Sequence, residues 1–371
     1  MARTRDQDAC PGALQVHRAA DGALARIRLP GGMIEPRQLE ALAHAATRFG
    51  SPAMELTSRG NIQIRGITDT VAVADAVAAA GLLPSPTHER VRNIVASPLS
   101  GRSGGTADVR EWVHRLDAAI CAEPILATLS GRFWFSIDDA RGDVSGRAAD
   151  VGAHVVGETV AVLLAGRDTG VRIAPDDTAA TLVSIAARFA ETRENAWRIT
   201  ELADTSALID GLVRTATPGA AWPPLGRPPV GWISQDDGRV ALGAALPLGV
   251  LEARVAEFLA AIEAPMVITP WRSVLVCDLA DGVADTALRV LAPMGLVFDT
   301  GSPWLDVSAC TGSPGCEHSA ADVRADAAAA VDEPSAVHRH FVGCERACGS
   351  PPAGDVLIAT GEGYVLRRAS P

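Results

Sequence analysis

Residues 56–65 read Leu-Thr-Ser-Arg-Gly-Asn-Ile-Gln-Ile-Arg, and this stretch decides the fold. Ile62 and Ile64 alternate with polar residues, which is the period of a β-strand with one buried face. The Ser-Arg-Gly run before them is typical of a turn. A second extended run, over 54–57, precedes the turn, so two neighbouring strands are expected here.

These strands end a unit that occurs twice in the chain. Before them a strand, a Leu-Pro turn and an amphipathic helix are expected, and the same order recurs later. The matching residues lie 217 positions apart: Leu29-Pro30, Glu35, Arg37 and Leu42-Ala43 correspond to Leu246-Pro247, Glu252, Arg254 and Leu259-Ala260. The strands that follow, Met266–Pro270 and Ser273–Val276, match at an offset of 212, so the second copy is five residues shorter.

The similarity extends beyond these strands. Val91–Ser97 resembles Trp304–Cys310 at an offset of 213, which places Ser97 where the second copy has Cys310. Two related halves, each with strands and packed helices, predict an α+β fold. Between the halves, 215–229 contains five prolines, which is typical of a stiff linker.

The repeat and the linker predict five segments. They are a first half-domain over 12–88, a domain over 89–214, the linker over 215–229, a second half-domain over 230–299 and a last domain over 300–371. Within 89–214 we expect a helix near 108–120, strands near 133–137 and 155–164, and helices across 176–214.

All 33 basic residues are Arg, which excludes mechanisms that need Lys as a Schiff base, a phosphate ligand or a general base. The net charge of −11 argues against nucleic acid and anionic membranes as partners. There is no run of 18 apolar residues, and residues 1–11 lack the apolar core of a signal peptide. A cytoplasmic protein is expected, and Cys121 and Cys277 lie in apolar surroundings typical of core packing.

Four of the seven cysteines lie near the C-terminus: Cys310, Cys316, Cys344 and Cys348. Their spacing is C-x5-C, then 27 residues, then C-x3-C, and both pairs lie in Gly- and Pro-rich loops. A structural zinc site fits poorly because its pairs are usually C-x2–4-C, and two disulfides would require an oxidising compartment. A [4Fe–4S] cluster on all four thiolates fits best. A helix over 317–331 is expected after Cys316, where its dipole would favour a thiolate.

This cysteine spacing resembles the cluster signature of the nitrite/sulfite reductase family. Residues 56–66 are similar to the family's T-[ST]-R-x-N-[IF]-Q-x-R-G segment, and Arg92-Asn93-Ile94 to its R-N-[IV] segment. The resemblance covers about residues 20–365. It implies a pseudo-twofold fold with two ferredoxin-like half-domains and two domains of the cluster- and tetrapyrrole-binding type. In the family the last cysteine, here Cys348, also bridges to a sirohaem iron.

Within the family, the chain length and the segment Ser97–Gly101 look most like those of an enzyme from the oxygen-dependent branch of cobalamin biosynthesis. That resemblance implies a monooxygenase that hydroxylates precorrin-3A at C20 and closes a γ-lactone with the ring A acetate. Two alternatives stay open: a ferredoxin-dependent sirohaem nitrite or sulfite reductase, and a non-catalytic iron–sulfur electron-transfer subunit. The reductases carry an R-K-F-[KN] segment, whereas Gly131-Arg132-Phe133-Trp134 stands here, without a cation at Trp134.

The resemblance also implies substrate-binding residues. Arg59 and Arg92 match family positions that contact tetrapyrrole carboxylates, and Arg132 is a third candidate. For Arg59 and Arg92 a surface ion pair is the competing interpretation. Asn61 is expected to shape the turn or to meet substrate. Trp134 would stack on the tetrapyrrole or belong to a buried strand.

Oxygen chemistry needs a centre with an open coordination position, which a cluster on four thiolates lacks. His338 and His340 alternate on an expected strand and would point to one face, so they are candidate ligands of a second, non-haem iron. A solvated surface is the competing interpretation of this pair. Sirohaem is the less favoured cofactor. The expected partners are the tetrapyrrole, O2 and an electron donor, either ferredoxin or an NAD(P)H-dependent reductase, and a monomer is expected.

Overall fold

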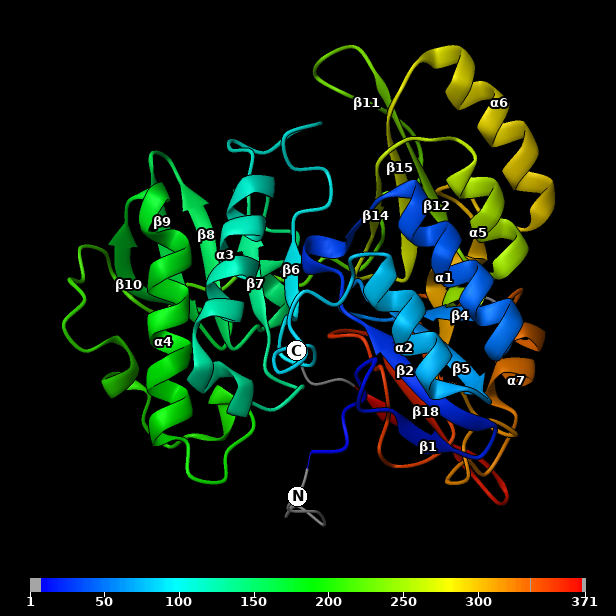
Figure 1. Cartoon of the computed structure of the whole chain (residues 1–371), viewed down its shortest axis with the longest axis horizontal. Coiled ribbons are helices and arrows are strands. Elements are labelled where there is room, and N and C mark those ends of the chain that lie inside the picture. The colour runs from blue at the N-terminus through cyan, green and yellow to red at the C-terminus, as the bar shows by residue number, and fades with distance from the viewer. Residues whose placement is uncertain (1–7, 334, 369–371) are drawn as a thin grey trace. The chain divides into compact units, whose positions relative to one another are not determined.

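The computed structural model describes residues 8–333 and 335–368, which form two compact units (Figure 1). The first unit comprises residues 8–12, 28–32 and 83–225. The second comprises 13–27, 33–82 and the described residues from 226 onward. The five predicted segments are a finer division of the chain, and their boundaries stay predictions.

The second unit contains two five-stranded sheets of the same design. The first has the order β1-β2-β5-β4-β13, with bounds His17–Ala19, Gly22–Ile27, Ile62–Ile67, Ala53–Leu56 and Val250–Glu252. The second has the order β11-β12-β15-β14-β3, with bounds Gly231–Ser234, Val240–Ala245, Ser273–Leu279, Met266–Ile268 and Met33–Ile34. The repeat seen in the sequence therefore appears in the structure as two sheets with the same strand order.

The two sheets exchange their last strands. β13, from the second repeat, pairs with β4 of the first, with Leu251 opposite Met54. β3, from the first repeat, pairs with β14 of the second, with Ile34 opposite Met266. Each copy thus closes one edge of the sheet of the other copy.

Helices cover these sheets, with bounds α1 Pro36–Phe49, α2 Thr70–Ala79, α5 Ala253–Ala260 and α6 Asp281–Leu291. α1 starts at Pro36 because proline suits the first helical position, and the Gln38 side chain accepts a hydrogen bond from the Glu35 N–H at 3.0 Å. Its buried residues Leu39 and Leu42 lie on one face, and α1 packs against α5.

A second pair of sheets also shares one pairing pattern. In the first unit the order is β10-β9-β8-β7-β6, with bounds Arg167–Ile173, Thr159–Leu164, Val151–Val156, Phe135–Asp138 and Ile94–Ala96. In the second unit it is β16-β17-β18-β19, with bounds Val307–Ala309, Arg339–Val342, Asp355–Thr360 and Gly363–Arg368. β6, β7 and β8 are parallel, as are β16, β17 and β18, and an antiparallel strand follows each set. The predicted similarity of Val91–Ser97 to Trp304–Cys310 is thus confirmed in structure.

The remaining helices pack on this second pair of sheets, with bounds α3 Arg110–Ala122, α4 Thr178–Thr192 and α7 Val323–Ala329. α4 contributes Phe189, which stacks on Phe133 and is fully buried with it. Short 3-10 helices occur at Pro30–Gly32, Pro124–Thr128, Ser145–Arg147, Pro175–Asp177, Ile199–Glu201, Ser206–Ile209, Pro247–Gly249, Ala292–Met294 and Pro303–Asp306. Among the described residues, no helix has both the length and the hydropathy needed to cross a membrane.

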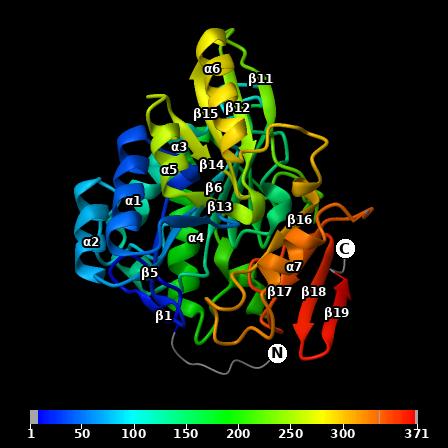
Figure 2. The ribbon, with the colours of Figure 1, turned by 90° about the vertical axis from the view of Figure 1, so that its right-hand side faces the viewer.

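Two sequence expectations were wrong in detail. The strand expected over 155–164 is the β8–β9 hairpin, which turns at Gly157 with φ 58°. The helix expected over 317–331 is only α7, which packs on β16 and β17 (Figure 2). It begins late because the Ala320 N–H bonds to the Gly343 carbonyl at 2.8 Å, and Asp322 then caps the helix. Cys316 therefore does not lie at a helix N-terminus.

Candidate metal centre

The four C-terminal cysteines line one cavity of about 230 Å³ in the second unit. Cys310 directly follows β16, and Cys344 comes two residues after β17. Because β16 and β17 are parallel neighbours, their carboxyl ends lie at the same edge of the sheet. Cys316 and Cys348 lie further along the same two loops, and all four thiols are free. The structure therefore gathers the predicted ligand set in one place.

Backbone N–H groups and burial act in opposite directions on the pKa of the thiols. The Gly343 N–H donates to Cys310 Sγ at 3.3 Å. Burial raises the pKa of the Cys310 and Cys348 thiols, and the neighbouring sulfurs raise it further. The N–H groups of Gly343 and Gly312 oppose this at Cys310. Bringing four sulfurs together disfavours four bare thiolates, so a cation such as a cluster iron would relieve the repulsion.

A buried polar network fixes the first cysteine loop to the first sheet. Glu55, only 8% exposed on β4, accepts hydrogen bonds from Gln63 at 2.9 Å and Thr311 at 3.3 Å. Arg324 of α7 donates to the same carboxylate. Arg65 donates to the Gly315 carbonyl at 2.7 Å and to Asp21 at 2.9 Å. Glu55 was missed by sequence reasoning, although a charged residue inside the apolar Met-Glu-Leu run was a usable signal.

His338 and His340 do point to one face, as predicted, and both lie 2.7 Å from Ser308 Oγ. Their other ring nitrogens donate to the carbonyls of Leu305 at 3.2 Å and Cys348 at 3.0 Å. His340 is fully buried, and burial together with nearby Arg272 lowers its pKa to about 3. Each imidazole would have to give up one of its two hydrogen bonds to bind iron. A second iron here stays a prediction. The surface interpretation of the pair is wrong for His340.

The proposed substrate residues fall in both units. In the second unit, Asn61 is buried, and its N–H donates to Thr57 Oγ1 at 3.1 Å, which supports the turn-shaping role. Arg59 is half-buried in the same turn. Arg92, Arg132 and Trp134 belong to the first unit. Contact of all five with one ligand stays a prediction.

Within the first unit the three residues differ in environment. Arg92 is 4% exposed and forms a bidentate pair with Asp117, with both N–O distances at 2.7 Å. Arg132 is exposed, and its guanidinium lies 5.0 Å from the centroid of the Trp197 ring. Trp134 is 5% exposed in a core cluster with Val95, Val144 and Ala149. Arg92 is therefore held in a buried ion pair and not in a surface one, and Trp134 is buried directly before β7 and not within a strand.

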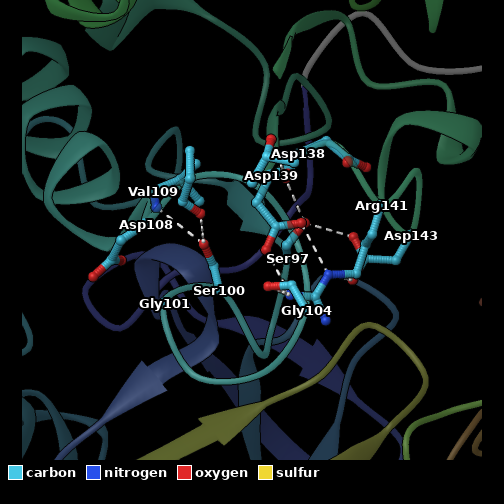
Figure 3. Close-up of polar contacts among 12 residues, drawn as sticks. Ser97, Ser100, Gly101, Gly104, Asp108, Val109, Asp138, Asp139, Arg141 and Asp143 are labelled. Atoms are coloured by element: carbon cyan, nitrogen blue, oxygen red, sulfur yellow. Dashed lines mark hydrogen bonds and ion pairs between the residues drawn. The ribbon is translucent and has the colours of Figure 1, made fainter. Parts of the chain in front are cut away.

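The sheet β6–β10 carries a counterpart of the cysteine site (Figure 3). Ser97 follows β6 as Cys310 follows β16, and the Asp139 N–H donates to Ser97 Oγ at 3.1 Å. Ser97 donates to Asp143 at 2.6 Å, and Asp139 forms two hydrogen bonds with Arg141 at 2.9 and 2.6 Å. Asp138, Asp139 and Asp143 lie together and are buried. Burial, helped by Asp138, raises the pKa of Asp143 to about 7.

Comparison with protein families and curated proteins finds relatives of the kind that the sequence motifs indicated. Residues 16–79 match the model of the nitrite/sulfite reductase ferredoxin-like half domain. A precorrin-3B synthase of Sinorhizobium sp is 24% identical over 383 positions, covering 96% of this chain and 82% of that protein. A ferredoxin–nitrite reductase of Synechococcus elongatus is 34% identical over 104 residues, 27% of this chain and 20% of that enzyme. The sulfite reductase (NADPH) hemoprotein beta-component of Shouchella clausii is 29% identical over 26% of this chain and 18% of its own.

The fold has a solved relative. The structure of the Mycobacterium tuberculosis NirA protein matches with a TM-score of 0.77 at 19% identity, covering 93% of this chain and 73% of that one. The α+β architecture with ferredoxin-like sheets is therefore the fold expected from the sequence. The chain spans about a fifth of the length of each of the two reductases that it matches. Together the matches support the nitrite/sulfite reductase-like family indicated by the motifs.

Proposed function

We propose that this chain, with its nitrite/sulfite reductase-like fold, carries out the precorrin-3B synthase reaction of aerobic cobalamin biosynthesis. In it, O2 hydroxylates precorrin-3A at C20 and a γ-lactone closes with the ring A acetate. The observation that carries the proposal is the extent of similarity. The precorrin-3B synthase aligns over 96% of the chain, whereas the two reductases align over 27% and 26%.

The residues at the metal centre fit a [4Fe–4S] cluster. Cys310, Cys316, Cys344 and Cys348 line one cavity, are not paired in disulfides, and receive at least one backbone N–H bond to sulfur. When bound, such a cluster would transfer electrons one at a time. A monooxygenase needs these electrons from a donor other than its substrate. The chain's part is to hold the first ligand loop in place through Glu55, which accepts hydrogen bonds from Thr311 and Arg324.

The substrate would be recognised through its carboxylates. Arg59, Arg92 and Arg132 are the proposed ligands of these groups, with Asn61 and Trp134 beside them. Arg92 would need to share its guanidinium with Asp117, and Arg132 would leave the face of Trp197. The oxygen-activating centre would be a second iron near His338 and His340 or a sirohaem. A ferredoxin or an NAD(P)H-dependent reductase would deliver the electrons.

Turnover tests the proposal directly. Anaerobically purified protein is incubated with precorrin-3A, a reductant and O2, and the product is followed by mass spectrometry. The expected result is hydroxylated, lactonised product that incorporates oxygen from 18O2. Reduction of nitrite or sulfite with a sirohaem absorption band would instead establish the reductase alternative. Cluster reduction without either turnover would establish the electron-transfer alternative.

A further inference from the structure

The turn between β14 and β15 repeats the backbone hydrogen bonds of the turn between β4 and β5, with an arginine where the first turn has a glycine. In the first, the Thr57 N–H bonds to the Asn61 carbonyl at 2.9 Å, and the Gly60 N–H to the Thr57 carbonyl at 3.1 Å. In the second, Thr269 bonds in the same way to Ser273 at 2.9 Å, and Arg272 to Thr269 at 3.1 Å. Arg272 therefore occupies the position of Gly60.

This position requires a left-handed backbone. Gly60 adopts φ 67° and Arg272 adopts φ 57°. Glycine takes this conformation without a steric cost, whereas a long side chain at positive φ is strained. Backbone strain of this kind is often kept at functional sites. The contacts of the Arg272 side chain can therefore indicate its function.

The side chain of Arg272 reaches the second cysteine loop. Its Nη2 donates to the Gly349 carbonyl at 2.7 Å, directly after Cys348. Two glycines make room for it. A Cβ on Gly249 would lie 2.7 Å from Cδ of Arg272, and a Cβ on Gly349 would clash with the guanidinium. Since His340 donates to the Cys348 carbonyl, two consecutive carbonyls of this loop are each held by a side chain from another element.

Arg272 differs in its pairing from two other arginines near the site, Arg65 and Arg324. Arg65 forms an ion pair with Asp21, and Arg324 forms one with Glu55. Within 8–333 and 335–368, no carboxylate forms an ion pair with Arg272. Burial lowers the pKa of Arg272, which Glu55 and Cys310 partly oppose, but a guanidinium remains charged at neutral pH. Its positive charge is therefore available to the sulfurs.

We propose that Arg272 is a positioning residue of the cysteine site, which fixes the Cys348–Gly349 peptide and raises the reduction potential of the cluster. The inference rests on the cluster of the proposed function. Reduction adds a negative charge to a group that four thiolates already make negative. A fixed cation nearby stabilises the reduced form more than the oxidised form, and net charge and hydrogen bonding are the protein's means of setting the potential.

The test is an EPR-monitored redox titration of the cluster in the full-length protein. Arg272→Gln keeps a hydrogen-bond donor but removes the charge, and Arg272→Lys keeps the charge. We expect Arg272→Gln to shift the one-electron equilibrium at least tenfold toward the oxidised cluster, which is about 59 mV to lower potential. Arg272→Lys should stay close to the wild type. Arg289→Gln, at a side chain 75% exposed on α6, removes the same charge elsewhere and should leave the potential unchanged.

The outcomes separate this inference from the proposed function. A wild-type potential in an Arg272→Gln protein that carries its full iron and sulfide would overturn the role of Arg272 while leaving the cluster intact. If Arg272→Gln loads no cluster, Arg272→Lys decides: a loaded cluster at the wild-type potential supports the role. A lower potential or an empty site in Arg272→Lys overturns it. Wild-type protein without iron would instead remove the cluster itself, and with it this inference.

Discussion

The sheets β16–β19 and β6–β10 share one backbone design, but the loops that follow their parallel strands contain different residues: cysteines in the first sheet, and a serine with three aspartates in the second. In both, a backbone N–H after the second parallel strand donates to a side chain after the first: Gly343 to Cys310 and Asp139 to Ser97. At the cysteine site the loop over 311–322 crosses Gly343, where a Cβ would clash with Ser319 Oγ. In the counterpart, Asp139 fills that position and is neutralised by Arg141.

In both sheets the backbone places an N–H donor beside the residue that follows the first parallel strand. The side chains at that position then determine which chemical group the site can bind. The cysteine site has Arg346 in its own second loop, and it also takes cations from elsewhere in the unit, through Arg65, Arg324 and Arg272. The counterpart has its cation, Arg141, within the loop, where it pairs with Asp139. The comparison predicts that perturbing the first region removes a bound group, whereas perturbing the second changes stability.

The largest effect is expected at a cluster ligand. Cys344→Ser removes one of four thiolates, so iron and acid-labile sulfide should fall from about four each to near zero. Iron analysis and the visible absorption spectrum measure this. Cys121→Ser, at a half-buried singleton in the first unit, is the matched control and should keep both. Colourless wild-type protein with one zinc would contradict the assignment.

The acidic counterpart should show itself in the pH dependence of stability. The pKa of Asp143 is raised to about 7 in the folded protein, from 3.8 as the ordinary value. The folded state therefore holds a proton that the unfolded state releases. The associated stability is present below pH 4 and is lost as the pH rises toward 7, up to about 4 kcal/mol. Urea unfolding at several pH values measures this.

Asp143→Asn should flatten that profile, because the amide cannot titrate but still accepts the hydrogen bond from Ser97. Asp176→Asn, at a side chain 92% exposed, is the control and should keep the wild-type profile. A profile for Asp143→Asn as steep as that of the wild type would assign the pH dependence to another group.

Glu55→Gln tests whether the cysteine site depends on cations brought from outside its loops. The amide keeps the volume but leaves Arg324 without its charge partner and weakens the hold on Thr311. Breaking a buried pair should lower the unfolding free energy by about 3 kcal/mol. The cluster content of purified protein should fall with it. Glu111→Gln, on the exposed Arg115 pair, should cost about 0.5 kcal/mol or less.

The smallest effect on stability is expected at Arg132. Arg132→Ala removes an exposed cation–π contact with Trp197, which is worth about 0.5 kcal/mol. If Arg132 binds a substrate carboxylate, the KM for precorrin-3A should rise severalfold while the melting temperature barely changes. An unchanged KM would leave Arg132 with only its contact to Trp197.

The sequence predicted those parts of the structure that depend on local patterns and on the spacing of motifs. The spacing of Leu29-Pro30 and Leu246-Pro247 revealed the repeat, and the four cysteines revealed the candidate centre. Long-range pairing was invisible. β3 has two residues and β13 has three, too few for any period to register. The late start of α7 depends on the Ala320–Gly343 hydrogen bond, and the role of Glu55 depends on Arg324, both distant in sequence.

The exchanged strands β3 and β13 have a consequence for biosynthesis. The first sheet stays incomplete until residue 252 has left the ribosome, because β4 has no outer partner before then. Until that moment β4 is an open edge that another chain could extend. A fragment ending at Leu225 would keep that edge permanently and should aggregate, although its sequence contains a complete copy of the repeat. Each copy completes the sheet of the other, so the two copies should not fold as separate modules.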